Sequence, residues 1–370
     1  MGRLRVAIIS AGRMASTIDD EIREHDTWLS LKSQLPYSHA PCYKTLSDDV
    51  DMVAVCDLDE AKCRAFCERW DVPRYYLDWR EMIERESPDI VSVAVAASMH
   101  AEMALFAMER GVRGIYCEKA MCCSLAEAEA IVAGAREHGT VFMLGAQRRH
   151  HPNFRKAREI IESGELGELV GVYSWIEGAL LHTLSHLADN SLYLAGDAAP
   201  VAVYGVLTGL RTTASMDHIE ARRVAGDLQY DTTTKRWNGD PGCSTYTAQL
   251  ENGVFLVHLP AFMDVRWEAV CSNGYVRIVD NNDTLQVYKR HGKTYTFDLT
   301  DAPVIGPASS HLALVRDLLR CVRNGGRTLA NEIVGIHGMQ ILMGAAQSHL
   351  EGGRQVDVAE IDRDMYIPSH

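Results

Sequence analysis

The sequence has few of the features that mark membrane, fibrous or nucleic-acid-binding proteins. Its longest apolar run, from Ile90 to Met99, includes two serines and is about half of the ~20 residues that a membrane helix needs. Glycine and proline occur at only 28 and 11 copies in 370 residues, which excludes a collagen-like or disordered chain. Lysine and arginine form no block and are outnumbered by acidic residues, 37 to 50, so a nucleic-acid surface has no support. The expected partner is a small molecule or another copy of the chain, with no nucleic acid and no membrane.

The ten cysteines show no paired Cys-x-x-Cys spacing, so we expect neither a metal site nor a disulfide framework. They should instead pack as small buried apolar residues in a reducing compartment. Cys56, Cys63 and Cys67 come nearest to a ligand cluster, but the last two are four apart, which is typical of one helical face. There is no signal-peptide cleavage pattern, and Val6 stands where a myristoylation signal has Ser or Thr. A cytoplasmic location is therefore predicted.

From Leu4 to Leu144, short β-rich runs alternate with longer amphipathic stretches, which is typical of a parallel sheet covered by helices. The predicted strands are Arg5–Ser10, Met52–Cys56, Ile90–Ala96, Gly114–Cys117 and Val141–Leu144. The predicted helices between them are Glu60–Trp70, Met99–Arg110 and Ser124–His138. We therefore expect an α/β domain with a doubly wound parallel sheet over residues 1–147.

The pattern of predicted elements changes in the second part of the chain, which should form an α+β domain over residues 148–370. After a predicted helix at Phe154–Ser163, the segments from Gly167 to Tyr295 resemble strands, with hairpin turns at 251–253 and 272–274. Helical spacing returns at 309–323 and 332–351, and these helices should pack back on one of the domains. This domain should hold a large, mostly antiparallel sheet with an open face. Such a face usually needs a cover, which favours a homodimer or homotetramer.

The turn after the first predicted strand fits a degenerate glycine-rich dinucleotide motif, Ser10-Ala-Gly-Arg-Met-Ala15. Gly12 would let the backbone approach a pyrophosphate, and the amides of Arg13 and Met14 would lie at a helix N-terminus that attracts phosphate. Ser10 replaces the first glycine of the motif. An ordinary structural turn is the alternative interpretation.

The second predicted strand ends at Asp57, where a carboxylate could bind the ribose hydroxyls of adenosine and repel a 2′-phosphate. This favours NAD over NADP. The alternative is that Asp57 caps the following helix. Asp57 lies 45 residues after Gly12 instead of the usual ~20, so residues 18–47 should contain an insertion.

Two further segments follow predicted strands at the edge where open α/β sheets bind ligands, Ser98-Met-His100 and Glu118-Lys119-Ala120. A positive nicotinamide beside Lys119 would disfavour its ammonium form and so suit the amine to proton transfer. The alternative is that Glu118 and Lys119 form a solvated pair before a helix.

Together these motifs resemble the Gfo/Idh/MocA family (glucose–fructose oxidoreductase, inositol dehydrogenase, rhizopine catabolism). Three later segments extend the likeness over nearly the whole chain: Gln147-Arg-Arg149, His186-Leu-Ala-Asp189 and Leu194-Ala-Gly196. The resemblance implies an N-terminal NAD-binding Rossmann domain and a C-terminal domain with an open-faced sheet. It also implies that Ser10, Gly12, Arg13, Met14, Asp57, Ser98, His100, Glu118, Lys119 and Gln147 contact the cofactor.

The resemblance further implies that Lys119 and His186 flank the reacting carbon. His182 stands where the family often has an aspartate, and it could serve as a further catalytic group. Arg148 or Arg149 could reach the substrate, although a structural arginine is as common, and we assign Arg148 to the substrate with Lys119 and the two histidines. The sequence departs from the family pattern at Val95-Ala96 and at Ala120, which replaces the proline of Glu-Lys-Pro.

The predicted function is that of an NAD-dependent sugar dehydrogenase acting on a secondary hydroxyl of a sugar, polyol or glycoside. His186 or Lys119 would remove the hydroxyl proton while hydride moves to NAD. One alternative is glycoside cleavage by transient oxidation and elimination, without net redox, for which His182 would suit the extra acid–base step. Another is a non-catalytic NAD-binding sensor.

Overall fold

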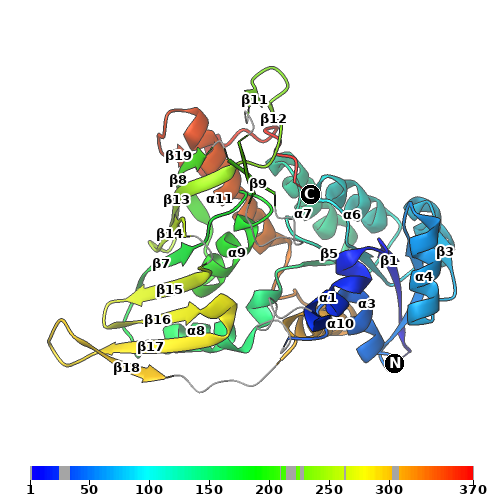
Figure 1. Ribbon diagram of the computed structural model, residues 1–370, viewed down its shortest axis with the longest axis horizontal. Coiled ribbons are helices and arrows are strands. Elements are labelled where there is room, and N and C mark those ends of the chain that lie inside the picture. The colour runs from blue at the N-terminus through cyan, green and yellow to red at the C-terminus, as the bar shows by residue number, and fades with distance from the viewer. Residues whose placement is uncertain are drawn as a thin grey trace. The chain divides into compact units, whose positions relative to one another are not determined.

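The computed structural model describes residues 2–24, 34–208, 210–213, 222–225, 229–261, 264–301 and 308–369 (Figure 1). The chain folds into two compact units, each assembled from distant parts of the sequence. Unit 1 comprises Met1–Cys122, Glu127–His150 and Pro307–Ile333, and unit 2 comprises Cys123–Ala126, His151–Gly306 and Val334–His370. Because the chain returns to unit 1 after Gly306, no single point in the sequence separates the two units.

A six-stranded parallel sheet forms the centre of unit 1, in the order β3-β2-β1-β4-β5-β6. Its strands are β1 (Leu4–Ile9), β2 (Val50–Cys56), β3 (Tyr75–Tyr76), β4 (Ile90–Val93), β5 (Gly114–Cys117) and β6 (Val141–Leu144). Strands β4 and β5 are buried along their whole length, as expected where helices cover both faces. The predicted doubly wound sheet is confirmed. Its order reverses between β1 and β4, and ligands bind at such a point, beyond the carboxyl ends of the strands.

Helices connect the strands of unit 1: η1 (Arg13–Thr17), α1 (Ile18–Glu24), α3 (His39–Thr45), α4 (Glu60–Trp70), α5 (Trp79–Glu86), η3 (Ala97–Met99), α6 (His100–Glu109), α7 (Leu125–His138), η4 (Gln147–His150) and α10 (Ser310–Asn324). Helix α4 begins at Asp59, whose carboxylate accepts hydrogen bonds from the backbone N–H groups of Ala61 and Lys62. Helix α10 comes from a distant part of the chain and packs closely on β5. A Cβ on Gly114 would lie 2.6 Å from Cγ2 of Val322, so this approach requires glycine.

Unit 1 differs from the sequence prediction in several places, among them two strand ends and one helix. The strand predicted to reach Ala96 ends at Val93, because Ala96 is already the N-cap of η3. The strand predicted over Arg5–Ser10 runs from Leu4 to Ile9. Helix α5 is not predicted, although its buried Trp79, Met82 and Ile83 have helical spacing. The described part of the predicted insertion at 18–47 holds α1 and α3.

Unit 2 contains a nine-stranded sheet in the order β18-β17-β16-β15-β7-β14-β13-β8-β19. Its strands are β7 (Leu169–Trp175), β8 (Pro200–Thr208), β13 (Gly242–Leu250), β14 (Phe255–Leu259), β15 (Arg266–Cys271), β16 (Gly274–Val279), β17 (Thr284–Arg290), β18 (Phe297–Asp301) and β19 (Val356–Asp357). All neighbours are antiparallel except β7 and β14, which confirms the predicted mostly antiparallel sheet. Strands β13 and β14 form one hairpin and β15 and β16 another, at the two predicted turns. Two small two-stranded sheets pair β9 (Leu210–Thr213) with β10 (Arg222–Ala225) and β11 (Tyr230–Asp231) with β12 (Arg236–Trp237).

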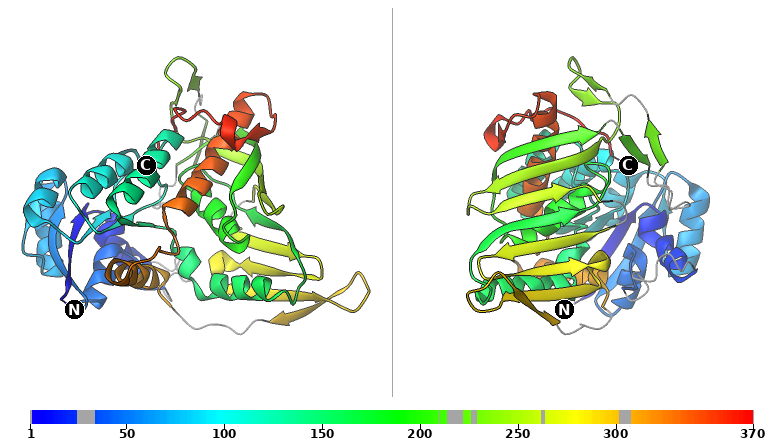
Figure 2. Two further views of the ribbon diagram at one scale, coloured as in Figure 1. Left: turned by 180° about the vertical axis from the view of Figure 1, so that it is seen from behind. Right: turned by 60° about the vertical axis from the view of Figure 1, so that its left-hand side comes forward.

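Three helices cover one face of this sheet: α8 (Pro152–Ser163), α9 (Leu184–Leu194) and α11 (Glu332–Leu350) (Figure 2). Phe154 of α8 meets the buried Trp267 edge to face, with ring centroids 5.0 Å apart. Gly205 of β8 lies against Ala345 of α11, where a Cβ would come within 2.5 Å. Helix α9 lies in the region predicted to hold strands. Its buried Leu184, Leu187 and Ala188 follow the three-and-four spacing of a helix, a period that the prediction missed.

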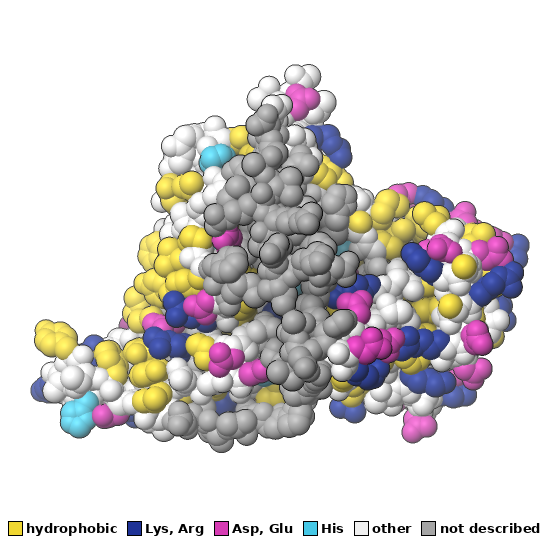
Figure 3. Space-filling view, in the orientation of Figure 1, with side chains coloured by type: hydrophobic (Ala, Val, Ile, Leu, Met, Phe, Trp, Pro, Cys, Tyr) yellow, Lys and Arg dark blue, Asp and Glu magenta, His cyan; other side chains and the backbone are white. Residues whose placement is uncertain are grey.

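The other face of the nine-stranded sheet carries exposed apolar side chains. Phe255 and Leu259 of β14 project from this face and keep 48% and 38% of their surface exposed. The sheet register places Tyr173 and Trp175 of β7 on the same face. In Figure 3, hydrophobic side chains gather over the strands around β7 and β14. The open face predicted for this sheet is therefore apolar.

All ten cysteines are free, and nine of them are buried, which agrees with the predicted packing role. The residues that the structure describes include no group of three His, Cys, Asp or Glu side chains able to hold a metal ion. Nor does any helix within these described ranges have the length and apolarity needed to cross a membrane.

Candidate functional site

The turn after β1 keeps the shape of a glycine turn although it begins with serine. Ser10 has a φ of +104°, in the left-handed region that favours glycine. Its backbone N–H donates to the carbonyl of Cys56 at 2.7 Å, and its Oγ accepts a hydrogen bond from the N–H of Gly12 at 3.0 Å. A Cβ on Gly12 would lie 3.1 Å from this Oγ, so a larger residue would crowd the turn. Ser10 therefore adopts the conformation of the missing glycine, and its hydroxyl occupies the backbone N–H of Gly12.

The helix that follows this turn presents further donors. It begins at Arg13 with Gly12 as N-cap and without a side-chain cap, so its first amides are not occupied by a capping side chain. Nε of Arg13 pairs with the Glu21 carboxylate at 2.7 Å, whereas its buried Nη2 finds no acceptor among the described residues. The side chain of Met14 packs against Ile18 and Ile22. The turn thus provides backbone and guanidinium N–H groups, and Met14 could reach a cofactor only through its backbone.

Asp57 lies beside the same turn, at the end of β2. One carboxylate oxygen accepts a hydrogen bond from the N–H of Ala11 at 2.8 Å, and the other accepts one from the N–H of Asp59 at 3.1 Å. Asp59, and not Asp57, is the N-cap of α4. The alternative interpretation of Asp57 as the helix cap is therefore wrong, and its partly exposed carboxylate lies beside the turn after β1.

Lys119 follows β5, in a turn held by His100. Nδ1 of the buried His100 lies 2.8 Å from the carbonyl oxygen of Ala120, and Nε2 lies 3.0 Å from that of Val95. Burial lowers the pKa of His100, although the two carbonyls oppose this shift. The peptide bond between Lys119 and Ala120 is cis. His100 thus ties the lysine turn to the end of β4, and its predicted cofactor contact stays a prediction, as does that of the exposed Ser98 in η3.

Glu118 carries a buried charge directly before Lys119. Its Oε1 accepts hydrogen bonds from Nε2 of His39 at 3.0 Å and from the hydroxyl of Tyr116 at 3.4 Å. Its Oε2 accepts one from the backbone N–H of Lys119 at 3.4 Å. Burial opposes ionisation, but the hydrogen bond from His39 and the nearby basic groups outweigh it and lower the pKa of Glu118 to about 2. A carboxylate therefore stands under the lysine turn at neutral pH.

Further polar side chains of unit 1 surround this carboxylate. The rings of Tyr37 and His311 lie 4.1 Å apart, and Gln147 is among the residues that act on the Tyr37 hydroxyl. Burial raises the pKa of Tyr37, the charge of Arg148 opposes this shift, and Glu118 adds to it. Burial lowers the pKa of His311 to about 3, so this imidazole is neutral at pH 7. The structure thus brings the predicted Glu118, Lys119, Gln147 and Arg148 together.

Sequence reasoning missed Tyr37, His39 and His311. The first two lie in the segment interpreted as an insertion, and His311 lies in a helix expected only to pack on a domain. Their positions depend on contacts between residues far apart in the sequence. The His39–Glu118 pair, for example, is separated by 79 positions, and periodicity does not report such a contact. The one signal in the sequence that could have found them is that Tyr37 and His39 have ionisable side chains and follow the nucleotide turn by a few tens of residues.

The two predicted histidines of unit 2 lie at the start of α9. The helix begins at Leu184, so His182 precedes it and only His186 lies in its first turn. The two histidines therefore do not both lie on the helix. The backbone N–H groups of Leu181 and His182 both donate to the carboxylate of Asp240, at 2.9 and 2.8 Å. Asp240, which the sequence analysis did not single out, fixes the backbone before the helix.

Comparisons with known proteins bear on the family and on the fold. Residues 4–146 match the model of the GFO_IDH_MocA family, described as an oxidoreductase family with an NAD-binding Rossmann fold. The chain is 28% identical to a myo-inositol 2-dehydrogenase of Thermotoga maritima over 130 residues. The matched segment covers 35% of this chain and 38% of that protein. The chain is 27% identical over 219 residues to a D-glucoside 3-dehydrogenase of Escherichia coli, with 54% and 56% covered. The chain thus spans about a third to just over half of the length of the curated relatives that it matches.

Solved structures resemble the fold over nearly its full length. A levoglucosan dehydrogenase in complex with NADH and L-sorbose has a TM-score of 0.74 at 17% identity, covering 97% of this chain and all of that one. An aldose-aldose oxidoreductase from Caulobacter crescentus, complexed with glycerol, has a TM-score of 0.72 at 18% identity, covering 96% and 100%. At this level of identity the likeness shows the fold alone.

Proposed function

Because the chain belongs through its Rossmann domain to the Gfo/Idh/MocA oxidoreductase family, we propose that it is an NAD-dependent dehydrogenase acting on a secondary hydroxyl of a sugar, polyol or glycoside. The observation that carries this proposal is the Lys119 turn. A lysine follows a buried, ionised carboxylate at the end of β5, on the same sheet edge as the glycine-type turn and Asp57. The names of the distant relatives, an inositol and a glucoside dehydrogenase, support the substrate class.

The residues of unit 1 fit a dinucleotide. Gly12 has no room for a Cβ beside Ser10, and Nη2 of Arg13 is buried without an acceptor among the described residues, so both suit a phosphate group. The Asp57 carboxylate suits the two ribose hydroxyls and would repel a 2′-phosphate, which favours NAD over NADP. When bound, NAD supplies the hydride acceptor.

Lys119 has the role of proton acceptor or hydroxyl-binding group in this proposal. Its partly exposed position leaves the side chain accessible, while Glu118 and His100 hold the turn that carries it. His186 is proposed as the partner group in proton transfer and His182 as an auxiliary group. Ser98 and Gln147 are proposed to contact the cofactor, and Arg148 the substrate.

Replacement of Lys119 by Ala tests the assignment. Acid–base assistance is worth ~10²–10⁴ in rate, so K119A should lose most of kcat on an active sugar or polyol and keep its Kd for NAD. The matched control is Lys62→Ala, at an exposed position of α4, which should behave as wild type. Wild-type protein that binds NAD and oxidises no member of a sugar and polyol panel would refute the dehydrogenase and favour a sensor.

We also propose a homodimer or homotetramer that covers the open face of the nine-stranded sheet. Phe255 and Leu259 project from this face together with Tyr173 and Trp175, and exposed apolar patches of this kind mark contact surfaces. Light scattering coupled to gel filtration tests the state.

A further inference from the structure

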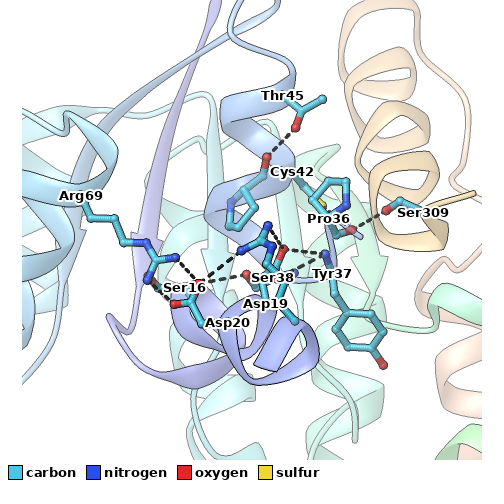
Figure 4. Close-up of polar contacts among 12 residues, drawn as sticks. Ser16, Asp19, Asp20, Pro36, Tyr37, Ser38, Cys42, Thr45, Arg69 and Ser309 are labelled. Atoms are coloured by element: carbon cyan, nitrogen blue, oxygen red, sulfur yellow. Dashed lines mark hydrogen bonds and ion pairs between the residues drawn. The ribbon is translucent and has the colours of Figure 1, made fainter. Parts of the chain in front are cut away.

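The segment before α3 is fixed to the helix that follows the nucleotide turn. Asp19 of α1 is fully buried, and its carboxylate accepts hydrogen bonds from the N–H of Ser38 at 2.8 Å and from the hydroxyl of Ser38 at 2.7 Å. It also accepts one from the N–H of Tyr37 at 3.2 Å (Figure 4). A buried carboxylate needs such donors, so this cluster specifies the path of the chain from residue 37 to 39.

A second attachment joins the same segment to α10. The hydroxyl of Ser309, the N-cap of this helix, donates to the carbonyl of Pro36 (Figure 4). It also accepts a hydrogen bond from the N–H of Leu312 at 2.9 Å. One residue later the Tyr37 ring lies against His311. Residues 36–39 are therefore held on both sides, and the direction of the His39 side chain is set by contacts that do not involve Glu118.

His39 in turn contacts the base of the lysine turn. The side chain is fully buried, its ring stacks on Tyr116 at a centroid distance of 3.9 Å, and its Nε2 donates to Oε1 of Glu118 at 3.0 Å. The second oxygen of Glu118 accepts from the backbone N–H of Lys119. These bonds form a continuous path from α1, through Ser38 and His39, to Glu118 and Lys119.

We propose that His39 is a positioning residue for Lys119, acting through Glu118. Its N–H keeps the buried Glu118 carboxylate in the ionised form and in place, and that carboxylate favours the ammonium form of Lys119 and fixes the lysine backbone. Helix α1 thereby influences, through Asp19 and residues 36–39, the charge that Lys119 experiences. This inference rests on the proposed function, since it concerns the lysine assigned to proton transfer.

Several ionisable groups face Glu118 and bear on this charge. They are His39 of α3, Tyr116 and Cys117 of β5, Lys119 itself, Tyr37 before α3 and His311 of α10. Burial raises the pKa of the Tyr116 and Cys117 side chains well above their ordinary values, so both are neutral. His311 is neutral at pH 7, as noted above. Two side chains donate hydrogen bonds to Glu118, and His39, at 3.0 Å against 3.4 Å for the Tyr116 hydroxyl, is the one that lowers the pKa of Glu118 most.

Competitive labelling of amines across a pH series tests the proposal without requiring turnover. An amine reacts only when neutral, so the pH of half-labelling of the Lys119 peptide reports the charge nearby. His39→Phe keeps the ring and its stacking on Tyr116 but has no N–H, whereas His39→Gln keeps an N–H donor. H39F should lower the half-labelling pH of Lys119 by about 1 unit, the low end of the ~1–3 units for loss of an opposite charge close by. H39Q should leave it near the wild-type value.

Further variants show whether His39 acts through Glu118. Glu118→Gln should lower the half-labelling pH as H39F does, and the double variant H39F/E118Q should show no additional shift. Lys62, labelled in the same samples, is the internal reference and should not change in any variant. An unchanged Lys119 midpoint in H39F, or equal shifts in H39Q and H39F, would overturn the proposal. Absence of dehydrogenase activity in the wild type would refute only the proposed function, because the labelling would still decide the role of His39.

Discussion

The backbone N–H of Ala11 donates a hydrogen bond to Oδ2 of Asp57 at 2.8 Å, which joins the turn after β1 to the end of β2. This bond aligns the carboxylate with the turn before any ligand arrives. The neighbouring Asp59 takes the separate task of capping α4. Two aspartates two residues apart therefore differ in role, and this difference provides a controlled test of cofactor choice.

Asp57→Asn should weaken NAD binding and reduce discrimination against NADP. Hydrogen bonds to a charged group are worth ~1.5–3 kcal/mol, so the Kd for NAD should rise about 10- to 100-fold. Titration of both cofactors by calorimetry measures the effect. Asp59→Ala is the matched control: it should lower the free energy of unfolding by ~1 kcal/mol through loss of the helix cap and leave the NAD to NADP ratio unchanged. An unchanged ratio in D57N would contradict the ribose assignment.

Ser10→Gly should strengthen NAD binding. Glycine adopts a φ of +104° without strain, and its lack of a hydroxyl releases the N–H of Gly12 for phosphate. One neutral hydrogen bond is worth ~0.5–1.5 kcal/mol, so the Kd should fall about 2- to 10-fold. Ser10→Val, whose branched side chain suits this conformation poorly, should instead lower the free energy of unfolding in urea by ~1–3 kcal/mol. Weaker binding by S10G would show that the serine hydroxyl itself contacts the cofactor.

Stability should fall as the pH drops from about 6.5 to 4, in part because of His258. This side chain is buried, and burial lowers its pKa to about 4. The unfolded chain takes up a proton below pH ~6.5 while the folded chain does not, so protons favour unfolding over this range. At ~1.4 kcal/mol for each pH unit, His258 contributes on the order of 3 kcal/mol to this loss. Urea unfolding at several pH values measures it.

His258→Phe removes this titration and keeps an aromatic ring beside Tyr246, whose ring centroid lies 5.2 Å from that of His258. The loss of unfolding free energy between pH 6.5 and 4 should therefore shrink in H258F. His138→Phe, at an exposed position at the end of α7, should keep the wild-type pH dependence. Identical pH dependence in H258F and the wild type would show that this histidine is not the cause.

Phe255→Asp should disrupt the proposed oligomer. Phe255 lies on the open face of the sheet with 48% of its surface exposed, and a carboxylate buried there by a partner subunit would be unpaired. Light scattering should then give a lower mass than for the wild type. Leu58→Asp in unit 1, at a leucine that is 91% exposed, is the control and should not alter the mass. A wild-type monomer, or an F255D protein of unchanged mass, would contradict the proposed interface.

The elements that sequence patterns predict best in this chain are those with a strong local period. The predicted bounds of β5, β6 and α4 agree with the structure to the residue. Gly111 and Gly139, which directly follow the predicted helices at 99–110 and 124–138, both have positive φ. Helix α5 was missed because it is short. Helix α9 was missed because the segments on both sides of it have the alternating pattern of strands, which hides its own helical spacing. Asp57 and Lys119 could be placed at strand ends because the order of strands and turns along the chain determines that position.

The sequence by itself determined the parallel sheet of unit 1, the mostly antiparallel sheet of unit 2, and the positions of Asp57 and Lys119 just after β2 and β5. These properties follow from periodicity and turn chemistry within a few residues. Only the tertiary structure decided that His39 donates to Glu118, that His311 lies against Tyr37, and that Asp240 holds the backbone before α9. Each of these contacts joins residues 58 or more positions apart, and their approach depends on how helices and loops pack over the sheets, which no local pattern encodes.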